Sequence, residues 1–284
     1  MGTLRLTAAP PTARAAATPV KASLPTPGVD DGELVQSLAR GLAVIETFGS
    51  DAAAQTLSDV ARRAGLARAT ARRLLHTLVA LGYAETDGRL FRLRPRVLDL
   101  GFSYLHAQGQ WALAQPAMVA LVEQVQESCS AAVLDETEIV YVARVPTRTR
   151  IVSVSLGLGS RLPAHATSMG RVLLAALPAE RLDAVLARAA PLPRHTERSI
   201  TDPRALRRAL RTVREQGFSL VDQEFEPGLR SIAVPLHDAA GRTVAALNVG
   251  THASRLSVAD LERRVLPSLK AAAGEIERAW GAAS

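Results

Sequence analysis

The spacing of apolar residues predicts helices in the first third of the chain. From Leu34 onward, apolar side chains recur every three or four positions, as they do in a helix with one buried face. The first such set is Leu34, Leu38, Leu42, Val44, Ile45 and Phe48. A short helix is expected after Thr56, which with Asp59 resembles a capping box. It should stop at Gly65.

A third helix is predicted up to Gly82. Its apolar stripe consists of Ala71, Leu74, Leu75, Leu78 and Leu81. Two helices joined through Ala64-Gly65-Leu66 fit the tight turn of a helix-turn-helix.

Short alternating segments follow the third helix. Asp87-Gly88 separates residues 83–86 from residues 89–93, and this dipeptide favours a tight β-hairpin. Three helices and then a basic hairpin give the order of a winged helix-turn-helix. Pro95 should close the hairpin, and a helix is predicted over 96–107 as a linker.

The rest of the chain alternates between strand and helix patterns. Strands are predicted at 130–135, 139–145, 149–155, 218–224, 230–237 and 243–250. Helices are predicted at 112–128, 168–176, 178–188, 203–216 and 257–279. Strands linked by hairpins, with segregated helices, indicate an α+β domain on an antiparallel sheet.

Four segments follow from these patterns. The Pro- and Ala-rich residues 1–33 are expected to form a disordered tail. Residues 34–95 should form the winged helix-turn-helix, 96–110 the linker helix, and 111–284 the second domain.

Composition fits this two-domain reading. The 284 residues are 48% hydrophobic, which is enough to build two cores. The net charge is +7, and residues 34–96 alone carry ten Arg against five Asp and Glu, a net of +5. No apolar run is long enough to span a membrane. The single cysteine, Cys129, is interpreted as a structural residue at a helix end, and we expect a cytoplasmic protein without cofactor or metal.

The basic charge predicts contact with double-stranded DNA. A recognition helix buries one stripe and turns the other toward the major groove. The candidate DNA-contacting residues on the helix and wing are Arg68, Thr70, Arg72, Arg73, His76, Arg89 and Arg92. The alternative is a solvated basic face that never meets DNA.

Several segments together resemble one family of bacterial regulators. They are residues 37–45, 57–61, 72–75, 81–83, 159–171 and 228–235. Over about residues 34–280 the chain resembles the IclR family. The resemblance implies a GAF-like α/β effector domain and homodimers or homotetramers on palindromic operators. Residues 139–145 and 167–175 are similar to the subgroup called PcaR/PcaU/PobR, which regulates aromatic-acid catabolism through the β-ketoadipate pathway and responds to protocatechuate, 4-hydroxybenzoate or β-ketoadipate.

A small organic acid therefore needs a site in the second domain. A helix beginning near Thr167, Ser168 and Met169 offers backbone N–H groups to an anion. The resemblance adds strand residues Ser231, Asn248 and Gly250 to the pocket. Further candidates are Arg144 and Arg161 for the carboxylate, with surface solvation or an ion pair as the alternative, and Asp222, Glu224 and Glu226 at the pocket mouth. His165 is interpreted as structural.

Two other functions stay open at this point. The second domain could serve only for dimerisation, or the chain could be an enzyme acting on an aromatic acid. The spacing of nucleophiles, histidines and glycines matches no catalytic or nucleotide-binding motif. The favoured hypothesis is a regulator in which an acid changes the arrangement of a dimer through the 96–107 helix.

Overall fold

A computed structural model describes residues 34–49, 52–107, 109–147 and 156–283. The chain divides between Tyr104 and Leu105 into two compact units, and each is considered by itself. The predicted tail 1–33 and the predicted strand 149–155 lie outside the described residues.

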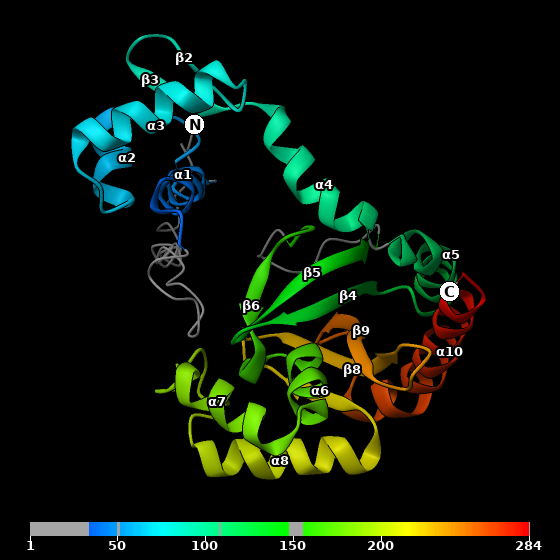
Figure 1. Ribbon diagram of the computed structural model, residues 1–284. Helices are drawn as coiled ribbons and strands as arrows, with labels where there is room; N and C mark the ends of the chain where they lie inside the picture. The colour runs from blue at the N-terminus through cyan, green and yellow to red at the C-terminus, as the bar shows by residue number, and fades with distance from the viewer. Residues whose placement is uncertain (1–33, 50–51, 108, 148–155, 284) are drawn as a thin grey trace, which may run out of the picture. The chain divides into compact units, whose positions relative to one another are not determined.

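The described part of the first unit contains three helices and a three-stranded sheet, followed by most of a fourth helix (Figure 1). In chain order its elements are α1 (Gln36–Glu46), β1 (Gln55–Thr56), α2 (Leu57–Arg63), α3 (Arg68–Ala80), β2 (Ala84–Thr86) and β3 (Leu90–Leu93). A 3₁₀ turn at Pro95–Val97 leads into α4 (Leu98–Ala107), the predicted linker helix, which crosses the boundary between the units.

One small core holds this unit together. Val44 from α1, Val60 from α2, Leu75 from α3 and Phe91 from β3 are buried against one another. The predicted apolar stripes were only partly right, because Leu38 of α1 is 62% exposed and Leu81 after α3 is 54% exposed. A helix period marks a face that is apolar, but it does not show whether this unit or a partner covers that face.

The hairpin is confirmed, with its turn at Asp87-Gly88. Ala84 pairs with Leu93 and Thr86 with Phe91. The Asp87 carboxylate accepts hydrogen bonds from the backbone N–H groups of Arg89 and Leu90, while Gly88 has φ of +92°, a backbone conformation that suits glycine. The sequence did not predict β1, which pairs with β3, because two residues are too few to show an alternation.

The second unit is built on an antiparallel sheet of six strands. Their order is β6 (Arg161–Pro163), β5 (Glu138–Val145), β4 (Ser128–Asp135), β9 (Thr243–His252), β8 (Leu229–His237) and β7 (Ser219–Asp222). Every neighbouring pair is antiparallel, which confirms the predicted sheet type. Only β6 was missed.

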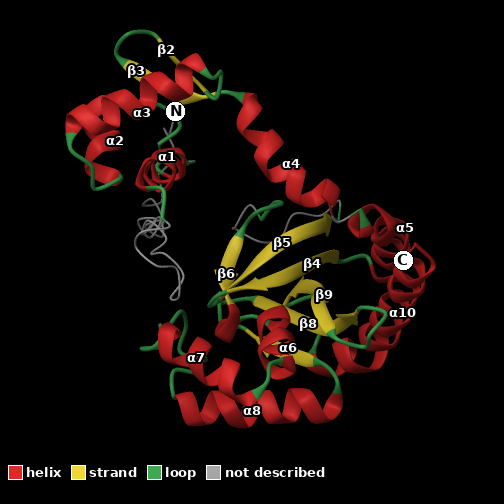
Figure 2. Ribbon diagram, viewed as in Figure 1, coloured by secondary structure: helices red, strands yellow, loops and turns green. Residues whose placement is uncertain are grey.

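Helices cover both faces of this sheet (Figure 2). One core cluster joins the sheet to α5 (Gln110–Val125) and α10 (Leu266–Ala283). The other joins it to α6 (Ser168–Ala176), α7 (Ala179–Ala189) and α8 (Pro203–Gln216). A short turn, α9 (Val258–Asp260), and a π-helical turn at Leu261–Val265 precede α10. In the part of the chain that the structure describes, no helix is long and apolar enough to cross a membrane.

The position of Cys129 differs from the one predicted from the sequence. It lies in β4 rather than at a helix end, and it is fully buried between strands. Burial raises the pKa of the Cys129 thiol to about 12, so the thiol stays protonated and unreactive at neutral pH. Its predicted structural role is consistent with this environment.

Candidate nucleic-acid interface and ligand cavity

The first unit carries a basic groove between α3 and the wing. Five of the seven predicted DNA-contacting residues line it, and they are Arg68, Arg72, Arg73, His76 and Arg89. The described groove-lining residues include no acidic side chain. The charged side chains in the groove are therefore all basic, which suits the phosphates of a duplex.

The burial of α3 explains why these side chains point outward. Ala71, Leu75 and Leu78 are buried, and the residues between them, such as Arg72 and His76, are therefore left on the exposed face. The His76 ring meets the buried Phe91 edge to face, with 6.1 Å between ring centroids. Within the described ranges, Arg68, Arg72, Arg73 and Arg89 form no ion pair. Their charges remain available.

Two predicted residues lie outside the groove lining. Thr70 is half-buried in the first turn of α3. Arg92 is exposed on β3 and lies 3.8 Å from the Asp87 carboxylate across the hairpin turn. These residues are less well placed for direct contact than the other five.

The second unit contains a cavity on the sheet face that packs against α6. It holds about 640 Å³ of space, counting its opening to solvent. Seven of the eight predicted effector residues line it, and they are Arg144, Thr167, Ser168, Met169, Ser231, Asn248 and Gly250. Its further lining residues are Ser128, Ser130, Tyr141, Leu156, Leu162, Ala166, Val221, Phe225 and Leu229.

Strand register explains the polar floor of the cavity. Residues opposite each other on neighbouring strands share one face of the sheet. Arg144 pairs with Ser130, and Ser130 pairs with Asn248, which forms one polar row across three strands. In a second row, Gly250 pairs with both Ser128 and Ser231. A Cβ at Gly250 would meet no atom within 4 Å, and these small side chains leave the room that a ligand needs.

The N-terminus of α6 closes the cavity opposite this floor. Thr167 caps the helix, and its hydroxyl accepts a hydrogen bond of 3.2 Å from the N–H of Gly170. The Ser168 side chain is 1% exposed, and its hydroxyl has no hydrogen-bond partner in the described structure. The first N–H groups of a helix lack partners within the helix and attract anions. This end of the cavity can therefore hold a carboxylate.

The two candidate arginines have different surroundings. Arg144 donates a hydrogen bond of 3.1 Å to the Ser130 hydroxyl, and no described carboxylate pairs with it. Arg161 forms ion pairs with Asp135 at 2.6 Å and Glu138 at 2.8 Å and does not line the cavity. Its environment is the ion pair that the sequence left as an alternative.

The sequence missed several lining residues. Ser128 and Ser130 alternate along β4, and their pairing with residues 250 and 248 becomes visible only once the strand register is known. Tyr141 lies on β5, and burial raises the pKa of its hydroxyl to about 12, which keeps it neutral. Phe225 comes from the loop between β7 and β8, where no periodic signal exists.

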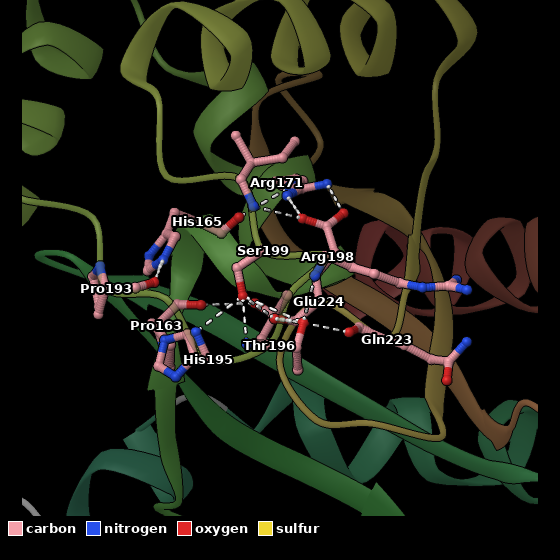
Figure 3. A network of polar contacts seen from close by, with 12 residues as sticks. Pro163, His165, Arg171, Pro193, His195, Thr196, Arg198, Ser199, Gln223 and Glu224 are labelled. Atoms are coloured by element: carbon pink, nitrogen blue, oxygen red, sulfur yellow. Dashed lines mark hydrogen bonds and ion pairs between the residues drawn. The ribbon is translucent and has the colours of Figure 1, made fainter.

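The acidic residues proposed for the mouth do not line the cavity. Asp222 pairs with Arg198 and Arg230, and the hydrogen bond from Arg230 lowers the pKa of the Asp222 carboxyl. Glu224 accepts two hydrogen bonds from Arg171, at 2.7 and 2.5 Å (Figure 3). These neighbours neutralise the carboxylates, which removes the repulsion that an acid ligand would meet.

His165 belongs to the same polar network and not to the cavity lining. Its ring lies 3.4 Å from the Pro193 carbonyl and 5.7 Å from the ring of His195. Burial lowers the pKa of both His165 and His195, so both are neutral at pH 7. The structure supports the structural role expected for His165. In the described ranges, no group of three or more His, Cys, Asp or Glu residues is placed to hold a metal ion.

Comparisons with known proteins match both units of the chain to one family. Residues 37–88 match the IclR helix-turn-helix domain, and residues 102–278 match the bacterial transcriptional regulator IclR C-terminal domain. The Pca regulon regulatory protein of Pseudomonas putida is 46% identical over 246 residues, which cover 87% of this chain and 84% of that protein.

Solved structures give the same result. A transcriptional regulator of Rhodococcus sp. RHA1 is 50% identical with a TM-score of 0.79, covering 88% of this chain and 100% of that chain. An IclR homologue of Microbacterium hydrocarbonoxydans, solved in complex with 4-hydroxybenzoate, is 33% identical with a TM-score of 0.76, covering 87% of this chain and 99% of that one. These matches describe regulators and not enzymes. The chain belongs to the IclR family of bacterial transcriptional regulators.

Proposed function

We propose that this regulator controls aromatic catabolic genes and responds to a small aromatic or related organic acid, in the class of protocatechuate, 4-hydroxybenzoate or β-ketoadipate. The main support for this proposal is the cavity of the second unit, in which Arg144 has no carboxylate partner among the described residues. The N-terminus of α6 adds donors at the other side. The names of the Pca regulon relative and of the homologue bound to 4-hydroxybenzoate support the ligand class.

The ligand class is tested by calorimetric titration of the full chain with 4-hydroxybenzoate, protocatechuate and β-ketoadipate. We expect at least one acid to bind saturably to the wild type. The Arg144→Met variant should bind that acid at least tenfold more weakly, because the carboxylate of the acid loses a charged hydrogen bond. Arg161→Met is the matched control, since Arg161 lies outside the cavity lining. Absence of binding for all three acids would contradict the proposal.

DNA binding is assigned to the basic groove of the first unit. The five lining side chains Arg68, Arg72, Arg73, His76 and Arg89 are proposed to contact the operator. Arg72→Ala with Arg73→Ala should weaken operator binding and reduce the slope of log K against log salt by up to about 2, because each phosphate contact contributes about 0.9. Fluorescence anisotropy at several salt concentrations measures this slope.

A charge-matched control separates specific contacts from net charge. Arg208 and Arg211 are exposed on α8 of the second unit and form no described ion pair. Arg208→Ala with Arg211→Ala should leave the salt slope close to that of the wild type. An equal decrease in both double variants would mean that overall charge, and not the groove, determines binding.

The regulator is further proposed to act in the cytoplasm as a homodimer or homotetramer. Leu38 and Leu42 lie one turn apart on α1 and are 62% and 47% exposed, so together they form an apolar strip that a partner can cover. A symmetric dimer would bury this face and place two recognition helices on a palindromic site. Leu38→Glu with Leu42→Glu should yield monomers in sedimentation, whereas unchanged assembly would refute this interface.

A further inference from the structure

The floor of the cavity holds a polar group that no described residue satisfies. Asn248 lies on β9, is 8% exposed and lines the cavity. Its amide oxygen, Oδ1, is enclosed and has no hydrogen-bond partner in the described structure. Leaving such a group unpaired is costly, and a molecule bound in the cavity that Asn248 lines can supply its partner.

The chemistry of an amide limits what that partner is. The side chain of asparagine both donates, through its NH₂ group, and accepts, through its carbonyl oxygen. A carboxylate only accepts, and it satisfies the NH₂ group while leaving the carbonyl oxygen without a donor. This holds whichever way the amide is turned. The complementary ligand therefore carries a hydrogen-bond donor besides its carboxylate.

We infer that Asn248 is a specificity-determining residue that recognises a hydroxyl group on the acid effector. The hydroxyl donates its hydrogen bond to the amide oxygen of Asn248. This inference rests on the proposed function, since it takes the cavity to be the acid-binding site.

The neighbours of Asn248 place the other parts of the ligand. Asn248 shares a row of the sheet with Ser130 and Arg144, and the outer members of a row across three strands are about 10 Å apart. The cation of Arg144, at the other end of this row, holds the carboxylate within the same cavity. Apolar side chains cover the ring, and they are Leu156, Leu162, Met169, Val221, Phe225 and Leu229.

The inference is tested with the full chain and four acids that differ only in hydroxylation. They are benzoate, 3-hydroxybenzoate, 4-hydroxybenzoate and 3,4-dihydroxybenzoate, each titrated calorimetrically. We expect at least one hydroxylated acid to bind about tenfold or more tightly than benzoate. In Asn248→Leu this preference should fall to about twofold or less, while benzoate still binds. Asn248→Ala provides a second variant should the leucine prevent folding.

Ser219→Ala is the matched control. Ser219 lies on β7, pairs with Ala233 in the same row as Asn248, and has a buried hydroxyl without a described partner. It does not line the cavity, so its removal should keep the preference for hydroxylated acids.

The outcomes separate the inference from the proposed function. If these four acids and β-ketoadipate, titrated alongside them, all fail to bind the wild type, the acid-binding function itself is refuted, whereas binding of β-ketoadipate alone overturns only the role of Asn248. If benzoate and its hydroxylated forms bind the wild type equally well, the acid site stands but the role of Asn248 is overturned, as expected if a buried water satisfies the amide. A preference that survives in Asn248→Leu also overturns it.

Discussion

At the scale of single residues, Gly170 shows how one absent side chain permits close packing. It lies in the first turn of α6, against the short turn at Ala164–Ala166. A Cβ on Gly170 would lie 2.2 Å from the carbonyl oxygen of Ala164 and 2.3 Å from its Cα. Both are backbone atoms, and neither can rotate away. The helix end that lines the cavity depends on this contact.

We predict that Gly170→Ala destabilises the second unit. Alanine would favour a helix by about 1 kcal/mol over glycine, but overpacking typically costs about 1–3 kcal/mol, and a clash with backbone lies at the upper end. The expected net loss is about 1–2 kcal/mol in urea unfolding. Gly250→Ala is the control, because its added Cβ meets no atom within 4 Å. Equal losses at both positions would contradict this reasoning.

The buried histidines predict a dependence of stability on pH. Burial lowers the pKa of both His165 and His195 below the ordinary histidine value of 6.5, so the unfolded chain binds more protons than the folded one as pH falls through that value. The contribution of these two neutral histidines to the free energy of unfolding is therefore complete above pH 6.5 and declines as the pH falls below that value. Urea unfolding at several values between pH 7.5 and 5.5 measures the decline. It should become smaller in His165→Gln with His195→Gln, and an unchanged profile would exclude these residues as its source.

At the scale of elements, one ion pair connects α6 to the loop after β7. Arg171 is buried on α6, and both oxygens of Glu224 accept its hydrogen bonds. Arg171 also donates to the His165 carbonyl at 2.9 Å, while Ser199 donates to the Glu224 carbonyl at 2.7 Å (Figure 3). The pair therefore holds the loop that supplies Phe225 to the cavity.

Replacing one partner of the Arg171–Glu224 pair should lower the free energy of unfolding more than replacing both partners. Arg171→Met leaves the Glu224 carboxylate, which is only 12% exposed, without its charged partner, and about 3–5 kcal/mol is typical for a fully buried pair. Arg171→Met with Glu224→Leu removes both charges, and we expect it to regain a substantial part of that loss. Urea unfolding of both variants measures the difference. Equal losses would indicate that the Arg171–Glu224 pair does not contribute as a unit.

At the scale of the whole molecule, the proposed acid site and the proposed operator site lie in different units. Coupling between them has to be reciprocal, because both equilibria share the same states. If an acid changes operator affinity by some factor, the operator changes acid affinity by the same factor, typically about 5- to 150-fold.

This reciprocity is directly measurable. Operator affinity is determined by anisotropy with and without saturating acid, and acid affinity by calorimetry with and without operator. Gly250→Leu should abolish the acid effect on both, because its side chain fills the open space above β9, while DNA binding without acid is retained. If the wild type binds an acid but its operator affinity does not change, the alternative in which the second unit serves only for assembly is favoured.

Periodic and local signals were enough to determine most elements of this protein. The hairpin turn, the recognition helix, the boundaries of α6 and α8, and the antiparallel type of the larger sheet follow from apolar spacing and from turn residues, since these depend on neighbours in the chain. The basic face of α3 and seven of the cavity residues were also identified from the sequence, the latter with the help of family resemblance.

Only the tertiary structure decided which side chains meet. It paired Arg161 with acidic residues outside the cavity, paired Glu224 with the buried Arg171, and exposed Leu38 despite its place in an apolar stripe. It also brought Ser130 beside Asn248, although 118 positions separate them in the chain. Such contacts depend on strand register and on the packing of elements that are far apart in the sequence. The spacing of residues in one amino-acid sequence contains no periodic signal for either.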